Sequence, residues 1–212
     1  MGNLLVGDGG INVLDGNQGW ATLVGQGGDD LLLSTSAGMY GELACDWLQK
    51  GRTLVDQPGN DKLVVVPPAP PEENSGGPTE AGNVVAGGPG NDLIDLGGIG
   101  SASVTYCDAP GAVTVNMSTS PGTSTGAAGA DTIHNLPPEF SLVGSDVSDN
   151  LTGSNLADDI YGGSGSDTIN GMGGNDYLRG QSGQDPLSGG ANTDICHEGI
   201  ADISCETVTD PD

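Results

Sequence analysis

The chain has 212 residues, of which 29 are acidic and 4 are basic, so its formal charge is −25 at pH 7. It contains one Phe, two Trp and four Tyr but 39 Gly, which leaves few large side chains for an ordinary packed core. The charge disfavours nucleic acid and anionic membrane surfaces as partners, no apolar run is long enough for a transmembrane helix, and cations are the natural partners.

The N-terminal third carries a nine-residue repeat with interruptions. Residues 7–33 read as three consecutive nonapeptides, GDGGINVLD, GNQGWATLV and GQGGDDLLL, with Asn12 in the first at the position that Asp30 holds in the third. Single copies follow as GELACDWLQ and as DQPGNDKLV, which contains Asp61. We therefore predict repeat structure over residues 1–66, irregular in part.

The stretch PPAPPEENSGGPTE within residues 67–86 interrupts the repeat. A segment so rich in proline cannot continue a stack of strands and is typical of an extended loop or linker. Two arrangements stay open: a loop inserted into one continuous stack, which repeat-like sequence on both sides favours, or a hinge between two stacks. The path of residues 34–86 stays undetermined.

The C-terminal half is more regular. After a single copy, GGPGNDLID with Asp92, six nonapeptides follow without a gap from Gly144, and two further blocks in the same phase extend the run back to Gly126 and include Asp131. In the six blocks position 1 is always Gly, position 6 is always Asp, and position 8 is Leu or Ile until Cys196. The predicted regions are thus N-terminal repeats over 1–66, a loop or linker over 67–86, single repeats over 87–125, a regular stack over 126–206 and an acidic tail over 207–212.

The repeat has a physical reading. One aliphatic residue between two variable ones, at positions 7 to 9, is the period-two pattern of a very short strand, and glycines at positions 1, 2 and 4 suit a tight turn. A three-residue strand is not stable alone, so successive turns must stack, two nonapeptides to a coil, with a sheet on either side. Each strand then gives one aliphatic side chain to a thin continuous core.

Stacking has an electrostatic consequence. It brings the position-6 Asp of one block close to the Asp two blocks along, and like charges at short range oppose folding unless a cation neutralises them. A hard divalent ion can accept carboxylate and carbonyl oxygens as ligands, and Ca²⁺ tolerates the irregular oxygen shell of a loop better than Mg²⁺ does. Zinc is a poor candidate because the repeat has no His or thiolate column.

The motif GGxGxD followed by an aliphatic residue, as in GGSGSDTIN and GGPGNDLID, resembles the hemolysin-type calcium-binding repeat of the RTX family. That resemblance implies an all-β fold, a right-handed parallel β-roll, with several calcium ions between successive turns. The segment from Val104 to Ser145 is similar to the strand-rich interruption often found between repeat blocks of that family.

The resemblance also implies the ligands. One ion is expected between blocks i and i+2, with Asp131, Asp149, Asp167 and Asp185 along one edge and Asp158, Asp176 and Asp194 along the other. Phe140 breaks the second edge, and the blocks with Val147, Leu156 or Asn192 at position 4 depart from the pattern. Asn12 with Asp30 is a further candidate site. The complete set of candidate metal ligands is Asn12, Asp30, Asp61, Asp92, Asp131, Asp149, Asp158, Asp167, Asp176, Asp185 and Asp194.

Four cysteines in a chain almost free of lysine favour an oxidising, extracellular setting. Cys196 and Cys205 both fall at position 8 if the register continues, so we expect them to face the core from opposite sheets and to form a disulfide, with buried free thiols as the alternative. Cys45 and Cys107 remain as a second pair by elimination, which spacing alone does not establish.

Other functions find little support. The histidines His134 and His197 fall at the outward position 9, and no Ser or Cys has the context of a catalytic triad, so we expect no enzyme. The outward positions carry no Thr-x-Thr ladder of the ice-binding kind. Tyr161, Tyr177 and Arg179 are a candidate adhesion surface for a glycan or a protein.

These observations predict a calcium-binding structural module of a secreted or surface-exposed protein, including a filament or virion surface, that folds and becomes rigid on binding Ca²⁺ outside the cell. The alternatives are an accessory module of a secreted enzyme and a glycan or protein adhesion module. No nucleic acid and no membrane insertion are expected, and the sequence does not define the oligomeric state.

Overall fold

Short strands form where the repeat places its aliphatic residue. In the regular run the strands Asn150–Thr152, Thr168–Asn170 and Pro186–Ser188 each cover positions 7 to 9 of a nonapeptide. The residue at position 8 is buried in each of them, while position 7 is exposed and position 9 is half-buried. This alternation confirms the predicted strands with one face on the core.

Successive coils stack with aliphatic residues in register. On one side Leu151 lies opposite Ile169, which lies opposite Leu187, and all pairs are parallel. On the other side Ile160 lies opposite Leu178, which lies opposite Cys196. Partners are eighteen residues apart, so two nonapeptides make one coil, as predicted.

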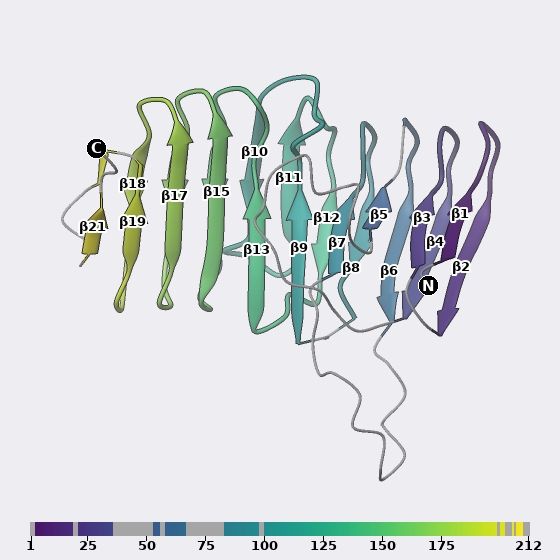
Figure 1. Ribbon diagram of the computed structural model, residues 1–212, viewed down its shortest axis with the longest axis horizontal. Coiled ribbons are helices and arrows are strands. Elements are labelled where there is room, and N and C mark those ends of the chain that lie inside the picture. The colour runs from purple at the N-terminus through teal and green to yellow at the C-terminus, as the bar shows by residue number, and fades with distance from the viewer. Residues whose placement is uncertain are drawn as a thin grey trace, which may run out of the picture.

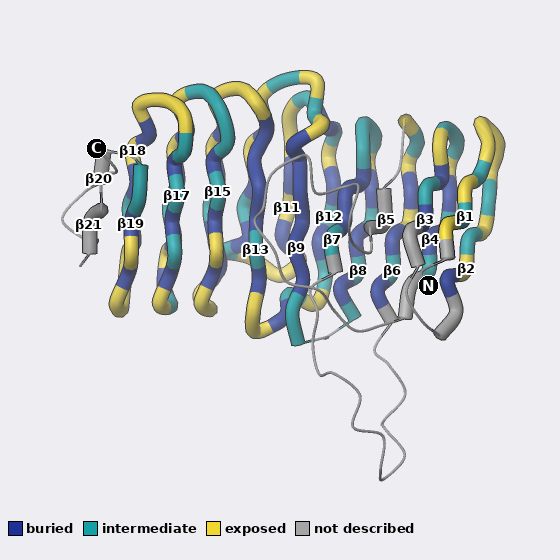
Figure 2. Tube along the Cα trace, viewed as in Figure 1, coloured by how far each residue is buried: buried dark blue, intermediate teal, exposed yellow. Residues whose placement is uncertain are grey.

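The computed structural model describes residues 3–18, 21–35, 53–55, 58–66, 83–97, 100–198, 200–201, 205 and 207–209. These residues form strands and turns, and no helix among them is long and apolar enough to cross a membrane. The strands lie side by side along the long axis of the molecule, from β1 and β2 at one end to β21 at the other (Figure 1). Burial follows the strands, and exposed residues gather at the turns on both edges (Figure 2).

Ten strands form one sheet, in the spatial order β1-β3-β5-β7-β9-β13-β15-β17-β19-β21. Their bounds are β1 Asn3–Val6, β3 Ala21–Val24, β5 Thr53–Val55, β7 Asn83–Ala86, β9 Ser101–Thr105, β13 Glu139–Val143, β15 Asp158–Ser164, β17 Tyr177–Ser182, β19 Ile195–His197 and β21 Thr207–Thr209.

Eleven strands form the facing sheet, in the spatial order β2-β4-β6-β8-β12-β11-β10-β14-β16-β18-β20. Their bounds are β2 Val13–Gln18, β4 Leu31–Thr35, β6 Lys62–Val66, β8 Leu93–Asp95, β10 Val113–Asn116, β11 Gly122–Gly126, β12 Thr132–His134, β14 Asn150–Thr152, β16 Thr168–Asn170, β18 Pro186–Ser188 and β20 Ile200–Ala201.

Both sheets continue past the proline-rich interruption. β5 pairs with β7, and β6 pairs with β8, in parallel. The segments 36–52 and 67–82 that connect these strands lie outside the described residues. The N-terminal and C-terminal repeats therefore form one continuous roll, which is the first of the two arrangements that the sequence left open.

A hairpin breaks the parallel order of the eleven-stranded sheet. β11 pairs antiparallel with both β10 and β12, and β10 then pairs in parallel with β14. In the sheet, β10 lies farther from β8 than the two strands that follow it in the sequence. The next strand, β11, lies between β10 and β12, and β12 pairs with β8. This is the strand-rich interruption expected from the sequence, and it puts two extra strands between β12 and β14.

The largest buried side chains gather around this hairpin. Tyr106, Met117 and Phe140 are each at most 3% exposed and belong to the same core cluster as the aliphatic column. Elsewhere a strand contributes little more than one Leu, Ile or Val to the core. Apolar packing is therefore richest in the middle of the roll and thinner in the regular C-terminal run.

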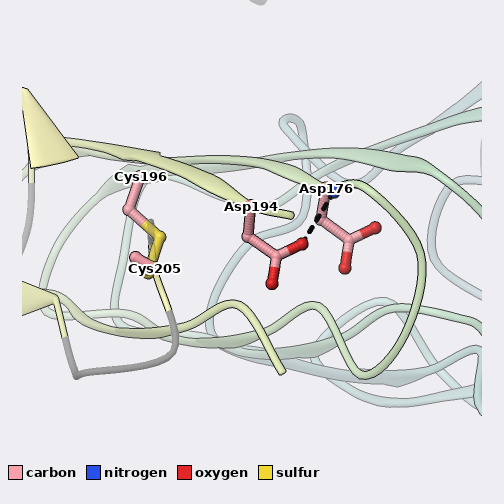
Figure 3. The surroundings of a disulfide bond; sticks show 4 residues. All are labelled: Asp176, Asp194, Cys196 and Cys205. Atoms are coloured by element: carbon pink, nitrogen blue, oxygen red, sulfur yellow. Dashed lines mark hydrogen bonds between the residues drawn. A yellow bond between two sulfur atoms is a disulfide. The ribbon is translucent and has the colours of Figure 1, made fainter. Parts of the chain in front are cut away.

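The C-terminal end is closed by a disulfide between Cys196 and Cys205, as predicted (Figure 3). The register expected for the last block does not hold, because β20 follows β19 after two residues and Cys205 lies outside any strand. Residues 207–209, expected in the acidic tail, form β21, whose Val208 lies opposite Cys196. Cys107 is a buried free thiol, so it does not pair with Cys45, which lies outside the described residues.

Gln181 shows the cost of a side chain at position 2 of the turn. Its φ is +67°, in the left-handed region that favours glycine. We expect Gln181→Gly to raise the free energy of unfolding of the calcium-loaded protein by about 1 kcal/mol. Gln184→Gly, at an exposed position of the same turn without positive φ, is the control and should not stabilise. Urea denaturation of both variants tests this, and equal effects of the two would contradict it.

Candidate metal centres

The position-6 aspartates are buried at the edges of the roll, where each turn enters its strand. Burial of so many carboxylates in a chain with four basic residues requires hydrogen bonds or a cation to offset the lost hydration. Their exposed fractions are 0% for Asp167, Asp185 and Asp194, 1% for Asp158, 2% for Asp61, Asp92, Asp131 and Asp176, 3% for Asp30 and 5% for Asp149.

One carboxylate oxygen of each aspartate from Asp167 onward joins a ladder along the edge. The backbone N–H of Asp149 donates to Oδ1 of Asp167 at 2.8 Å, and that of Asp167 donates to Oδ1 of Asp185 at 2.9 Å. On the other edge Asp158 N–H donates to Asp176 at 3.0 Å. Asp176 N–H donates to Asp194 at 2.9 Å (Figure 3). The structure thus brings together the i and i+2 aspartates of the regular run.

The second oxygen faces other acceptors. Oδ2 of Asp30, Asp167, Asp176 and Asp185 is buried and accepts no hydrogen bond. A Cβ added to Gly162 would touch both Asp167 Oδ2 and the carbonyl oxygen of Gly180. Acceptor oxygens therefore converge in a space that glycine at position 1 leaves open, and no donor reaches Oδ2 there.

This donor set fits a hard cation. Carboxylate and backbone carbonyl oxygens are calcium ligands, and a buried oxygen without a donor is the feature that a cation would satisfy. Within the described ranges no three His, Cys, Asp or Glu side chains group as a metal site. The acceptors near Asp167 Oδ2 include a backbone carbonyl, that of Gly180.

Burial makes the ionised carboxylates costly when no cation is present. It raises the pKa of Asp158, Asp167 and Asp176 from 3.8 to about 6. For Asp167 burial is the largest cause of the raised pKa, the hydrogen bond from Asp149 N–H lowers it, and the neighbouring carboxylates Asp149 and Asp185 contribute to raising it.

Acid should therefore stabilise the calcium-free protein. Between pH 6 and the ordinary pKa of 3.8 the folded state binds more protons at these aspartates than the unfolded chain does, so the free energy of unfolding rises as the pH falls through 6. We expect more β-structure by circular dichroism at pH 5 than at pH 8 in calcium-free buffer, and in saturating calcium a lower unfolding midpoint at pH 5 than at pH 8 because protons then compete with the ion. A loss of β-structure on acidification without calcium would contradict this.

The N-terminal candidates lie in the same kind of ladder, on one edge. Asn12 N–H donates to Oδ1 of Asp30 at 2.6 Å, as the predicted pairing of these two residues requires. Asp30 N–H then donates to Asp61, Asp61 N–H to Asp92, and Asp92 N–H to Asp131, at 2.7, 2.9 and 3.0 Å. These aspartates are 31, 31 and 39 residues apart in the sequence. Because one regular coil has eighteen residues, the repeat period does not identify them as neighbours.

Asp131 does not pair with Asp149, contrary to the expected edge. The two strands β10 and β11 lie between them. Oδ2 of Asp131 accepts hydrogen bonds from Ser124 Oγ at 2.7 Å and from Tyr106 Oη at 3.1 Å. Protein hydroxyls thus satisfy the carboxylate that ends the N-terminal ladder, and no repeat motif marks Tyr106 or Ser124 for this role.

Among the residues that the structure describes, the other edge has an acidic ladder only in its C-terminal part. Phe140 lies opposite Asp158 on one side and Ala102 on the other, and both Ala102 and Phe140 are buried. The expected break at Phe140 is confirmed. Apolar side chains occupy the positions that carboxylates hold further along.

The fold and its turns define a class: an all-β roll with parallel coils whose buried edge carboxylates suit a hard cation. The profile of the RTX calcium-binding nonapeptide repeat matches the chain in four copies, at residues 2–32, 79–98, 152–187 and 173–197. The chain therefore carries RTX calcium-binding repeats, and such repeats bind Ca²⁺. No curated protein matches the chain.

Proposed function

We propose that this chain is a calcium-dependent structural module of a secreted or surface-exposed protein. The observation that carries the proposal is the set of buried Asp Oδ2 atoms that accept no hydrogen bond, with carbonyl oxygens facing them across the turns. Where calcium is scarce, repulsion and lost hydration keep the repeats expanded. Where calcium is plentiful, ion binding contributes folding free energy and makes the roll rigid.

Asp30, Asp167, Asp176 and Asp185 are the side chains best placed to hold ions, together with backbone carbonyls of the adjacent turns. The ion supplies positive charge between acceptor oxygens. The proposal assigns no catalytic role to the chain. The Cys196–Cys205 disulfide supports an extracellular setting, because such bonds persist under oxidising conditions.

Equilibrium dialysis with ⁴⁵Ca²⁺, combined with small-angle X-ray scattering, tests this function. We expect several ions per chain and a decrease in radius of gyration on going from chelator to millimolar calcium, with no such decrease in magnesium. A chain that binds calcium without compaction, or that is equally compact in chelator, would rule out calcium-dependent folding.

Adhesion is a second candidate, supported by an aromatic row on the outer face of the ten-stranded sheet. The ring centroids of Tyr161 and Tyr177 are 6.3 Å apart, and those of Tyr177 and His197 are 4.9 Å apart. Arg179 Nη2 donates to Tyr177 Oη at 2.9 Å. Aromatic faces with hydrogen-bonding groups beside them suit a neutral glycan. Glycan-array binding that Tyr177→Ala abolishes would support adhesion, and absence of binding by the calcium-loaded chain would exclude it for the glycans tested.

A further inference from the structure

The turns that lead into the C-terminal strands are of two kinds. In the first kind, positions 2 and 4 both have positive φ, and we call these open turns. They include the turns in which Asp167, Asp176 and Asp185 keep a buried Oδ2 without a hydrogen bond. The residues at positions 2 and 4 are Gly163 and Gly165, Met172 and Gly174, Gln181 and Gly183, and Gly190 and Asn192.

The second kind comprises residues 144–149 and 153–158, and we call these closed turns. Ser145 N–H donates to Asp149 Oδ2 at 2.6 Å, and its hydroxyl lies 2.9 Å from Oδ1. Ser154 N–H likewise donates to Asp158 Oδ2 at 2.6 Å, with its hydroxyl 3.0 Å away. Neither serine has positive φ. In a closed turn, position 2 of the same block gives both a backbone and a side-chain donor to its own aspartate.

The serine hydroxyl also accepts a hydrogen bond from the backbone N–H at position 4. Val147 N–H donates to Ser145 Oγ at 3.3 Å, and Leu156 N–H donates to Ser154 Oγ at 3.0 Å. The first N-terminal turn has the same two backbone donors, since Asp8 N–H donates to Asn12 Oδ1 and Gly10 N–H donates to Asp8 Oδ1, but its side-chain hydrogen bond runs from Asn12 Nδ2 to Asp8 Oδ1. A polar side chain at position 2 thus closes the first turn of each acidic ladder.

On the hairpin side, the closed turns meet no other ladder carboxylate. Val113 N–H from β10 donates to Asp149 Oδ1 at 2.8 Å, and Phe140 lies opposite Asp158. Tyr106, Met117 and Phe140 are buried nearby in the best-packed part of the core. The closed turns therefore adjoin packing and hydrogen bonds that need no ion.

We propose that the closed turns 144–149 and 153–158 fold without calcium, and that ion binding at the open turns extends the roll from them through residues 162–197. The serine donors take the place of a cation at Asp149 and Asp158, so these two aspartates, although predicted as ligands, do not each require an ion. This inference rests on the proposed function, because it assigns a starting point to calcium-dependent folding.

Hydrogen–deuterium exchange of the full chain, read by mass spectrometry in chelator and in millimolar calcium, tests the inference. We expect residues 139–160 to be protected in chelator and residues 162–197 to become protected only with calcium. Residues 139–160 unprotected in chelator, with both segments protected by calcium, would overturn the inference and leave the proposed function standing. Full protection of residues 162–197 in chelator would instead overturn the proposed function.

The double variant Ser145→Ala/Ser154→Ala tests the role of the hydroxyls. We expect the calcium midpoint for protection of residues 162–197 to rise about twofold or more, while the number of ions bound at saturation stays the same. Ser182→Ala, at an exposed serine of β17, is the matched control and should leave the midpoint unchanged. A variant that loses bound ions, or one with an unchanged midpoint, would overturn the assignment.

Discussion

Asp167→Asn is expected to change the stability of the protein in opposite directions with and without calcium. In chelator at pH 7.5, where residues 162–197 of the native chain are expected to be unfolded, the variant should populate the folded segment more than the native chain does. It removes a buried charge between Asp149 and Asp185, and its amide nitrogen can replace Oδ2 on the side of the Gly180 carbonyl. In calcium the variant loses a charged ligand, and the calcium midpoint should rise at least about tenfold, since even outer-shell partners of a metal contribute that much.

The control is Asp146→Asn, which removes the same charge from an exposed position of the neighbouring coil. It should have little effect in either condition, apart from a small stabilisation through the lower net charge. Hydrogen–deuterium exchange of residues 162–197 in chelator, and a calcium titration, give the comparison for both variants. If Asp167→Asn and Asp146→Asn behave alike, the Asp167 carboxylate is not a calcium ligand.

Leu178→Ala is expected to cost about 3 kcal/mol in the free energy of unfolding of the calcium-loaded protein. Leu178 is 0% exposed and lies between Ile160 and Cys196 in the ten-stranded sheet. Because each strand here gives one aliphatic side chain to the core, few neighbours can move in to fill the cavity.

Ile195→Ala on the adjacent strand is the matched control. Ile195 is 39% exposed and points away from the core, so we expect a change of about 0.5 kcal/mol. Urea denaturation in saturating calcium measures both. A loss at Leu178 no larger than the loss at Ile195 would mean that the aliphatic column contributes little to stability.

These expectations follow from a difference between the middle of the roll and its C-terminal run in what stabilises them. The middle of the molecule is held by Tyr106, Phe140 and the hairpin strands, and hydroxyls satisfy Asp131 and Asp149 there. The regular C-terminal run has a thinner core and buried carboxylate oxygens that accept no hydrogen bond. We therefore expect calcium to have its largest effect where apolar packing is weakest.

The regular run could be predicted from the sequence because it repeats without insertion. A step of nine residues fixes the strand, the turn and the facing sheet at once, so the registers of Leu151 with Ile169 and of Ile160 with Leu178 follow from counting. The burial of the position-6 aspartates follows from the same register.

The N-terminal ladder could not be ordered by counting. Asp30, Asp61 and Asp92 are neighbours in the ladder although each is 31 residues from the next, and a nine-residue period does not predict a step of that length. Tertiary pairing of β5 with β7 and of β6 with β8 settles the order.

The antiparallel pairing within the strand-rich interruption and the closed turns were not predicted, for different reasons. An antiparallel excursion within one sheet depends on long-range pairing, so the sequence placed Asp131 next to Asp149 although β10 and β11 separate them. The closed turns had a local signal, serine at position 2 in GSDVSDNLT and GSNLADDIY. Its meaning depends on the Ser145 and Ser154 hydroxyls turning back to their own aspartates, which only the structure shows.

The most direct test of the account is a far-UV circular dichroism titration of chelator-stripped protein with Ca²⁺, with Mg²⁺ in parallel. We predict a cooperative gain of β-structure with calcium alone, added to a smaller β-signal already present in chelator from the middle of the roll. A spectrum that is fully β-rich in chelator and unchanged by calcium would contradict the account, because the aspartate ladders would then fold without the ions assigned to them.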